Sequence, residues 1–303
     1  MCSAIVSDPI LSIDCKQGAV RAVRFNDDGN YCLTCGSDKT VKLWNPERDI
    51  LLRTYTGHGY EVLDARGSCD NAHLASCGMD KQVFQWDVST GKTIRRYRGH
   101  AAPVNAVCYN EDSTVIVSGS TDTCVMTWDV RSKNTEPIQN LNEASDSVTS
   151  VAVSDYEILS GSADCRVRRY DMRVGKLHED FVASSITSVS FSRDGQCVLV
   201  SSLASIARLL DKETGELLAE YEGHKNRTYK TDSCFNHNDT MVLSGSEDGN
   251  VYCWDFVEGT LVQKLRHSMP TVHSISGHPT KPRLITASMS RIYYWNIEVD
   301  QQS

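Results

Sequence analysis

Short apolar segments alternate with turn residues along the whole chain. Most segments hold four to seven residues, and Gly, Asp, Asn and Ser separate them. One type of segment ends in Trp-Asp or a close variant and recurs seven times, anchored at Trp44, Trp86, Trp128, Tyr170, Leu210, Trp254 and Trp295. Successive anchors are 42, 42, 42, 40, 44 and 41 residues apart. A period this constant predicts seven copies of one structural unit.

Each copy contains the same parts in the same order. A Gly-His pair comes first in three copies, at His58, His100 and His224, and an apolar strand follows it. A second strand carries Ser-Gly-Ser before a turn Asp, as in 117–122. The third strand holds the Trp, and a fourth follows a turn, as in 51–55. Segments this short leave no room for helices, so the pattern predicts an all-β protein.

A period of about 40–45 residues with Gly-His and Trp-Asp resembles the WD40 repeat. The resemblance covers nearly the whole chain and implies an all-β fold in which residues 1–303 form a single seven-bladed WD40 β-propeller. We place the blades at about 16–56, 57–98, 99–143, 144–182, 183–222, 223–267 and 268–300, with a closing strand at about 9–14.

The closing strand follows from the two ends of the repeat array. Only residues 296–303 come after Trp295, too few for a turn and a fourth strand. The apolar segment 10–13 lies one period, 42 residues, before 52–55, which is itself a fourth strand. We therefore expect the N-terminal segment to complete the last blade, which removes a free sheet edge.

Three copies carry a complete set of His, Ser, Asp and Trp. The sets are His58, Ser76, Asp80 and Trp86; His100, Ser118, Asp122 and Trp128; and His224, Ser244, Asp248 and Trp254. A catalytic triad would not recur three times at one phase of a repeat. The resemblance to WD40 blades implies instead a hydrogen-bonded network that ties the Gly-His loop to the central strands.

The other copies depart from this set. Blade one has Lys16 at the His position, and blade four has Tyr170 in place of Trp. Blade five has Ala204 for Asp and Leu210 for Trp, so we expect no network there; blade seven has Met289 for Asp. Such blades are either tolerated variants or sites of partner contact, and the sequence favours neither.

Binding residues are predicted from the propeller architecture. Loops between blades and the hairpins before the Trp strands converge on one face around the central channel, which we call the top face. The candidates by phase are Arg21, Glu61, Leu63, Asn105, Thr149, Thr187, Lys230 and His273, and in the hairpins Ser37, Met79, Thr121, Ala163, Leu203 and Glu247. Apolar residues surrounded by charges suit a protein interface better than a nucleic-acid interface.

Composition limits the other classes of function. With 31 Lys and Arg against 39 Asp and Glu, the net charge is −8, which argues against electrostatic binding of nucleic acid. No apolar stretch is long enough for a membrane helix, and the first residues lack the basic and apolar regions of a secretory signal. We therefore expect no direct nucleic-acid or membrane partner.

Cofactor and metal chemistry find no support in the sequence. The chain lacks nucleotide-binding glycine motifs, metalloprotease motifs and clustered metal ligands. Twelve cysteines are spread evenly, and the two of the single Cys-x-x-Cys, Cys32 and Cys35, lie on one strand, where side chains three apart face opposite ways. We expect reduced, mostly buried cysteines, no metal or cofactor, and no enzymatic activity.

The densest basic cluster is 166–169. Arg166 and Arg168 should share one strand face and Arg169 the other. A solvated strand is the favoured interpretation, and a site for an acidic peptide or phosphate is the alternative.

Longer segments resemble the mitogen-activated protein kinase organizer family of WD40 scaffolds. They are 18–26, 28–40, 57–64, 167–171, 191–197, 211–218 and 223–226, and the likeness spans about residues 14–296. The resemblance implies a non-enzymatic, monomeric scaffold for MAP kinase (ERK) cascade proteins, also associated with spliceosomal proteins and with a prolyl hydroxylase. It implies a cytoplasmic and nuclear location. The chain departs from the family at its N-terminus, at Ala204 and in blade seven.

A weaker resemblance concerns two arginines that follow Trp-Asp-like strands. Arg131 and Arg173 fit the Trp-Asp-x-Arg pattern of substrate receptors for cullin-four ubiquitin ligases. An arginine at this position is also common for turn reasons alone. The ligase receptor is therefore the alternative to the scaffold.

Overall fold

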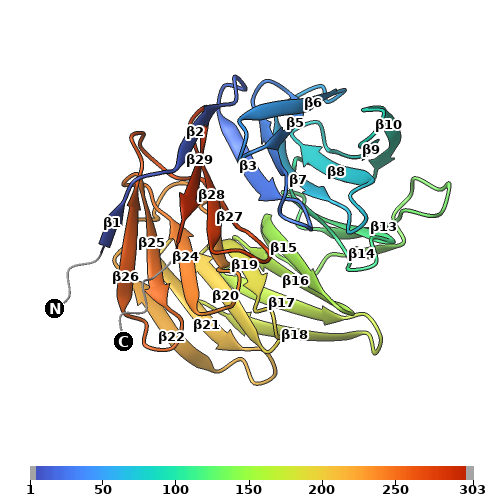
Figure 1. Ribbon diagram of the computed structural model, residues 1–303. Coiled ribbons are helices and arrows are strands. Elements are labelled where there is room, and N and C mark those ends of the chain that lie inside the picture. The colour runs from blue at the N-terminus through green and yellow to red at the C-terminus, as the bar shows by residue number, and fades with distance from the viewer. Residues whose placement is uncertain (1–4, 298–303) are drawn as a thin grey trace.

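Seven small β-sheets surround a central channel in the computed structural model, which describes residues 5–297 (Figure 1). Within these residues all regular elements are strands, 29 in number, and none is a helix that could span a membrane. The all-β, seven-bladed propeller predicted from the repeat is confirmed.

The consecutive strands of each blade pair antiparallel and follow one another from the channel outward. Blade one contains β3 (Val20–Phe25), β4 (Cys32–Gly36), β5 (Thr40–Asn45) and β6 (Ile50–Thr56); blade two contains β7 (Val62–Gly67), β8 (His73–Gly78), β9 (Gln82–Asp87) and β10 (Thr93–Arg98); blade three contains β11 (Val104–Tyr109), β12 (Val115–Ser120), β13 (Val125–Asp129) and β14 (Gln139–Leu141).

The remaining blades repeat the order. Blade four contains β15 (Val148–Ser154), β16 (Glu157–Ser162), β17 (Arg166–Asp171) and β18 (Lys176–Phe181); blade five contains β19 (Ile186–Phe191), β20 (Cys197–Ser202), β21 (Ile206–Asp211) and β22 (Leu217–Glu222); blade six contains β23 (Ser233–Phe235), β24 (Met241–Gly245), β25 (Asn250–Asp255) and β26 (Leu261–Arg266); blade seven contains β27 (Ser274–Gly277), β28 (Arg283–Ser288) and β29 (Arg291–Asn296).

The N-terminal segment closes the ring. Strand β2 (Leu11–Asp14) pairs antiparallel with β29, with Leu11 opposite Tyr294 and Asp14 opposite Arg291. This pairing gives blade seven its fourth strand and confirms the predicted closure. Because the first and last segments of the chain share one sheet, opening the ring would cost the pairing of a whole strand.

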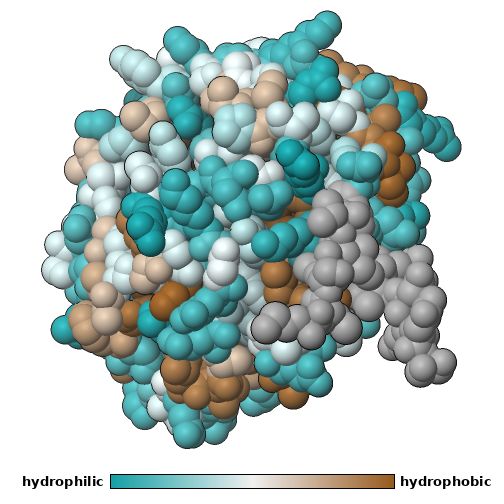
Figure 2. All heavy atoms as spheres, turned by 90° about the vertical axis from the view of Figure 1, so that its left-hand side faces the viewer, coloured by the Kyte–Doolittle hydropathy of each residue, from teal (hydrophilic) through white to brown (hydrophobic). Residues whose placement is uncertain are grey.

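A strand before β2 extends blade six, and the repeat pattern does not predict this extension. Strand β1 (Ile5–Ser7) pairs in parallel with β26, with Ile5 opposite Gln263, and makes a fifth strand on that sheet (Figure 1). The side of the molecule that carries β1 and β26 shows apolar residues in separate groups among hydrophilic ones (Figure 2). Because β1 pairs with the outermost strand, β26, it covers the outer edge of blade six.

The core consists of seven apolar clusters between neighbouring blades. One cluster, for example, joins Val83 and Tyr97 of blade two to Val107 and Trp128 of blade three. The largest fully buried side chains are four of the repeat anchors, Trp86, Trp128, Trp254 and Trp295. At about 25 cal/mol per Å² and roughly 150–250 Å² each, burial of one indole contributes roughly 4–6 kcal/mol. The repeat period therefore places the main stabilising side chains at the blade interfaces.

The inner strands of blades one to five carry a β-bulge near their start. In β3 the pairing shifts between Val20 and Ala22, and β7, β11, β15 and β19 shift at the same phase. A bulge redirects the side chain of its extra residue. The extra residues are Arg21, Leu63, Asn105, Thr149 and Thr187, five of the positions predicted for the top face.

Candidate functional site

A pocket of 310 Å³ lies where the inner strands begin, at the top end of the channel. We call it the top pocket. Its lining includes seven of the predicted top-face residues, namely Arg21, Glu61, Leu63, Met79, Asn105, Lys230 and His273. Tyr229 also lines the pocket and was not predicted. Because these residues come from blades one, two, three, six and seven, only the closed ring brings them together.

Charged groups in the top pocket are partly paired. The Nη2 atom of Arg21 lies 2.9 Å from Oε2 of Glu61, and both side chains are partly exposed. The Nζ atom of Lys230 donates to the carbonyl oxygen of Asn105, 3.3 Å away, and so links blade six to blade three across the channel. An exposed ion pair contributes about 0–1 kcal/mol to stability, so these groups remain available for a partner.

Exposed apolar groups lie beside these charges. Met79 is 45% exposed and Tyr229 is 52% exposed, both large fractions for apolar or aromatic side chains. The Tyr229 ring packs edge-on against His273, with 5.7 Å between ring centroids. Apolar anchors within a charged surround are characteristic of protein interfaces.

Glu247 shapes the loop that carries Tyr229. Its Oε1 atom accepts hydrogen bonds from the backbone N–H groups of Arg227, Thr228 and Tyr229, at 2.9, 2.5 and 3.0 Å. Burial alone would raise the pKa of Glu247, but these three N–H groups outweigh it and lower the pKa. Glu247 therefore positions the loop and does not line the pocket.

The three threonines predicted for this face lie outside the top pocket. Thr187 is only 3% exposed, and its Oγ1 accepts a hydrogen bond from Nδ2 of Asn226, so the outward orientation predicted for it is wrong. Thr149 is half-buried and donates to the carbonyl oxygens of Gly161 and Ile186. Thr121 is exposed and accepts from Nδ2 of Asn105. As Thr149 shows, a polar side chain at a bulge can hydrogen-bond to the backbone of the next blade instead of facing the channel mouth.

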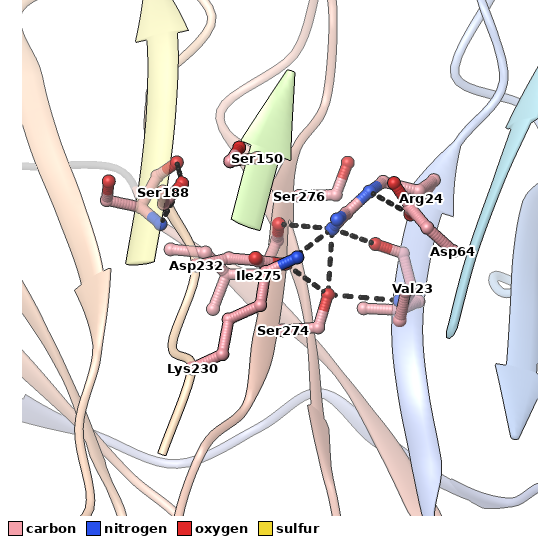
Figure 3. A network of polar contacts seen from close by, with 12 residues as sticks. Val23, Arg24, Asp64, Ser150, Ser188, Lys230, Asp232, Ser274, Ile275 and Ser276 are labelled. Atoms are coloured by element: carbon pink, nitrogen blue, oxygen red, sulfur yellow. Dashed lines mark hydrogen bonds and ion pairs between the residues drawn. The ribbon is translucent and has the colours of Figure 1, made fainter. Parts of the chain in front are cut away.

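Below the top pocket, a buried ionic cluster lies in the channel. The Nη1 atom of Arg24 donates to Oδ2 of Asp232 at 2.7 Å and to Oγ of Ser274 at 2.8 Å, and Nε lies 3.2 Å from Oδ1 of Asp64 (Figure 3). Ser274 also donates to Asp232 at 2.6 Å. Burial alone would lower the pKa of Arg24, but the two carboxylates raise it. The cluster ties blades one, two, six and seven together beneath the pocket.

Two of the three predicted polar sets form complete networks. In blade two, Ser76 Oγ lies 2.7 Å from Nε2 of His58 and accepts from Nε1 of Trp86 at 2.8 Å. Nδ1 of His58 is 2.8 Å from Oδ2 of Asp80. Blade three has the same arrangement around Ser118, with 2.8 Å to His100 and 2.9 Å to Trp128. These groups are buried between strands, which agrees with a structural role.

The network predicted for blade six does not form. The hydroxyl of Tyr252 donates to Oδ2 of Asp248 at 2.7 Å, at the strand position that Phe84 and Met126 occupy in blades two and three. Both ring nitrogens of His224 lack a hydrogen-bond partner within residues 5–297. Nε1 of Trp254 donates to the carbonyl of Glu222. Ser244 Oγ donates to the carbonyl of Gly245. A tyrosine hydroxyl on the neighbouring strand therefore replaces the histidine.

Two blades form networks that sequence reading missed. In blade one the buried Gln17, next to the expected Lys16, accepts from Thr34, which in turn accepts from Nε1 of Trp44 at 2.9 Å. In blade seven Thr286 Oγ1 joins Nε2 of His267 at 3.0 Å and Nε1 of Trp295 at 2.8 Å. Both networks could have been predicted from the threonine on the strand next to the Trp strand, because a threonine hydroxyl can replace that of serine.

The basic cluster of blade four is neutralised by its own blade. Nη2 of Arg168, which is buried, lies 2.8 Å from Asp164 and 2.9 Å from Glu179. Arg169 pairs with Glu157, and Arg166 with Glu179. The solvated strand expected for this cluster is therefore wrong for Arg168, and the carboxylates occupy the groups that an acidic ligand would need.

The two Trp-Asp-x-Arg arginines pack against their own turns. Nε of Arg131 lies 3.7 Å from Asp129, and Nη2 of Arg173 lies 3.6 Å from Asp171. Arg173 also stacks over the ring of Tyr156. Within residues 5–297, no group of three or more His, Cys, Asp or Glu side chains is arranged to hold a metal ion.

Comparisons with known proteins agree with this architecture. A family described as nucleolar protein 10-like, N-terminal domain, matches residues 65–247, and the WD domain, G-beta repeat, matches residues 7–45. The chain is 63% identical over 287 residues to WD repeat domain-containing protein 83 of Mus musculus and to that of Homo sapiens, covering 95% of this chain and 91% of each relative. An uncharacterized WD repeat-containing protein of Schizosaccharomyces pombe is 45% identical over 281 residues, covering 91% of this chain and 95% of the relative.

Proposed function

Since this chain belongs to the family of WD repeat domain-containing protein 83, a family of WD40-repeat proteins, we propose that it is a non-enzymatic scaffold that captures protein partners at the top pocket. WD40 propellers generally mediate protein–protein interactions. The observation that carries the proposal is the composition of the pocket, where exposed Met79 and Tyr229 lie beside Arg21, Glu61 and Lys230.

The proposed partners are components of the MAP kinase (ERK) cascade and proteins of the pre-mRNA splicing machinery, with a prolyl hydroxylase as a further partner. The support is the sequence resemblance of residues 14–296 to the kinase-organizer scaffolds. The location that we propose with these partners is both cytoplasm and nucleus. The acidic net charge of −8 favours contacts to the proteins of a splicing complex over direct contacts to its RNA.

The alternative, a substrate receptor of a cullin-four ubiquitin ligase, has less support. Turn geometry accounts for the conformations of Arg131 and Arg173 without a partner, because each is close to the Asp two residues before it. Met79 and Tyr229, by contrast, leave about half of their side-chain surface exposed at the top pocket.

Affinity purification of the tagged chain from its own cells tests the proposed partners. Nuclear and cytosolic fractions are purified separately and analysed by mass spectrometry, with an unrelated tagged propeller as the control. We expect kinase-cascade proteins in the cytosolic fraction and splicing proteins in the nuclear fraction. Recovery of cullin-four ligase subunits in place of both groups would contradict the proposal.

A further inference from the structure

A second cavity lies deeper in the channel, below the top pocket. It has a volume of 230 Å³. The charged groups that line it are three cations, Arg24, Arg66 and Lys230, and two carboxylates, Asp64 and Asp232. Cys234 also lines it, and burial raises the pKa of that thiol to about 12, so it is neutral. The lining therefore carries a net charge of +1.

Among the described residues, Arg66 and Lys230 are the two cations of this lining that make no ion pair, and Lys230 donates to the carbonyl oxygen of Asn105. Both carboxylates contact Arg24, with Asp232 at 2.7 Å and Asp64 at 3.2 Å. Within residues 5–297, the Arg66 guanidinium makes no hydrogen bond or ion pair, and its Nε is buried without a partner. Burial and the charge of Arg24 lower the pKa of Arg66, which reflects the cost of a cation held in a medium of low dielectric constant.

Serine hydroxyls line the same cavity. Ser150, Ser188, Ser190, Ser233 and Ser276 come from the inner strands of blades four to seven, and Figure 3 shows Ser150 and Ser188 on the side of the channel away from Arg24 and Asp64. Ser233 is 5% exposed, and its Oγ has no hydrogen-bond partner among the described residues; the same holds for Oγ of Ser190. Donor groups without acceptors thus line the cavity together with the unpaired Arg66.

We propose that this channel cavity binds one small inorganic monoanion, such as chloride, held by Arg66 with donation from Ser190 and Ser233. One negative charge balances the net charge of the lining. A second would be opposed by Asp64 and Asp232, so the site selects a monoanion over a divalent phosphate or sulfate. Arg66 also lines a 300 Å³ cavity that opens beside Asn110 and Ser113, at the far end of the inner strands. This inference does not depend on the proposed scaffold function.

Chloride-35 NMR of the full chain tests the proposal. Chloride in exchange with a protein site broadens the free chloride line, and we expect excess broadening with the wild-type protein that added bromide reverses. Arg66→Met should bind chloride about tenfold more weakly, the change expected when one charge-assisted hydrogen bond is lost. Arg48→Met removes an exposed arginine on a turn outside the channel and is the matched control.

Folding of each variant is checked by circular dichroism. Removing an unpaired charge on the half-buried Arg66 should not unfold the chain, and Ser233→Ala provides a second variant with a smaller change. Reduced broadening in Arg66→Met and Ser233→Ala, with Arg48→Met unchanged, would support the site. Wild-type protein without bromide-reversible broadening, or equal broadening in wild type and Arg66→Met, would overturn it.

Discussion

Replacing Arg24 by methionine should lower the free energy of unfolding by about 3–5 kcal/mol, the usual effect of removing one partner of a buried ion pair. The side chain is buried in the channel, with ionic contacts to Asp232 and Asp64. Methionine preserves much of the volume but removes the cation that contacts both carboxylates. Urea denaturation of wild type and variant measures the difference.

A rescue that neutralises the two carboxylates separates electrostatics from packing. Adding Asp64→Asn and Asp232→Asn to Arg24→Met removes the unpaired carboxylates and should restore most of the lost stability. Arg48→Met, on an exposed turn, should stay within about 0.5 kcal/mol of wild type. A loss below about 1 kcal/mol in Arg24→Met would contradict a structural role for the cluster.

The same cluster predicts a pH dependence. Burial alone would raise the pKa of Asp232, but the charges of Arg24 and Lys230 and hydrogen bonds from Ser274 and Arg24 lower it below 3.8. A lowered carboxyl pKa contributes stability that is present above the unfolded value and is lost as the pH falls through the folded value. The difference between wild type and Arg24→Met should therefore shrink below about pH 4.

Replacing Ser118 by alanine should cost about 2–4 kcal/mol, whereas Ser244→Ala in blade six should cost about 1 kcal/mol or less. Asp122 can only accept, so Nδ1 of His100 carries the proton, and Ser118 donates to Nε2 while accepting from Trp128. Alanine leaves two buried polar groups unpaired. Ser244 has neither of these contacts, because its hydroxyl donates to the carbonyl of Gly245.

Thermal and urea denaturation of the two alanine variants measure this contrast. Both serines are fully buried, so a difference between the two variants does not come from exposure of the hydroxyl. Equal losses in Ser118→Ala and Ser244→Ala would show that the His, Ser and Trp network adds nothing to the burial of a hydroxyl, and would contradict its stabilising role.

The fold could be predicted because repetition multiplies a weak signal. A single Trp-Asp strand is ambiguous, but seven at nearly constant spacing fix the strand order and the closing strand. Most of the top pocket could also be predicted, because its residues recur at one phase of the repeat. The structure shows a bulge at this phase, which places Arg21, Leu63 and Asn105 near the channel mouth.

The features that the sequence did not predict depend on contacts between different strands. In blade six the hydroxyl of Tyr252 donates to Asp248 in place of the histidine, and the sequence of one strand alone does not show this contact. The channel cluster follows from one ring of inner-strand positions, Ala22, Asp64, Ala106, Ser150, Ser188, Asp232 and Ser274. Aligning the copies at that phase would have shown two acids in the ring, and Arg24 lies two residues further along β3. Strand β1 has no counterpart in the repeat, so periodicity could not predict its parallel pairing with β26.

The most direct test of the account is partner capture by a top-pocket variant. Arg21→Glu, Glu61→Arg and Lys230→Glu combined reverse three charges while keeping opposite charges at positions 21 and 61, so the fold should be retained. The matched control, Arg48→Glu, Lys133→Glu and Glu136→Arg, changes the net charge equally on exposed turns. We predict about tenfold lower recovery of co-purifying proteins with the top-pocket variant only. Full recovery with a correctly folded top-pocket variant would contradict the assignment of this face as the binding site.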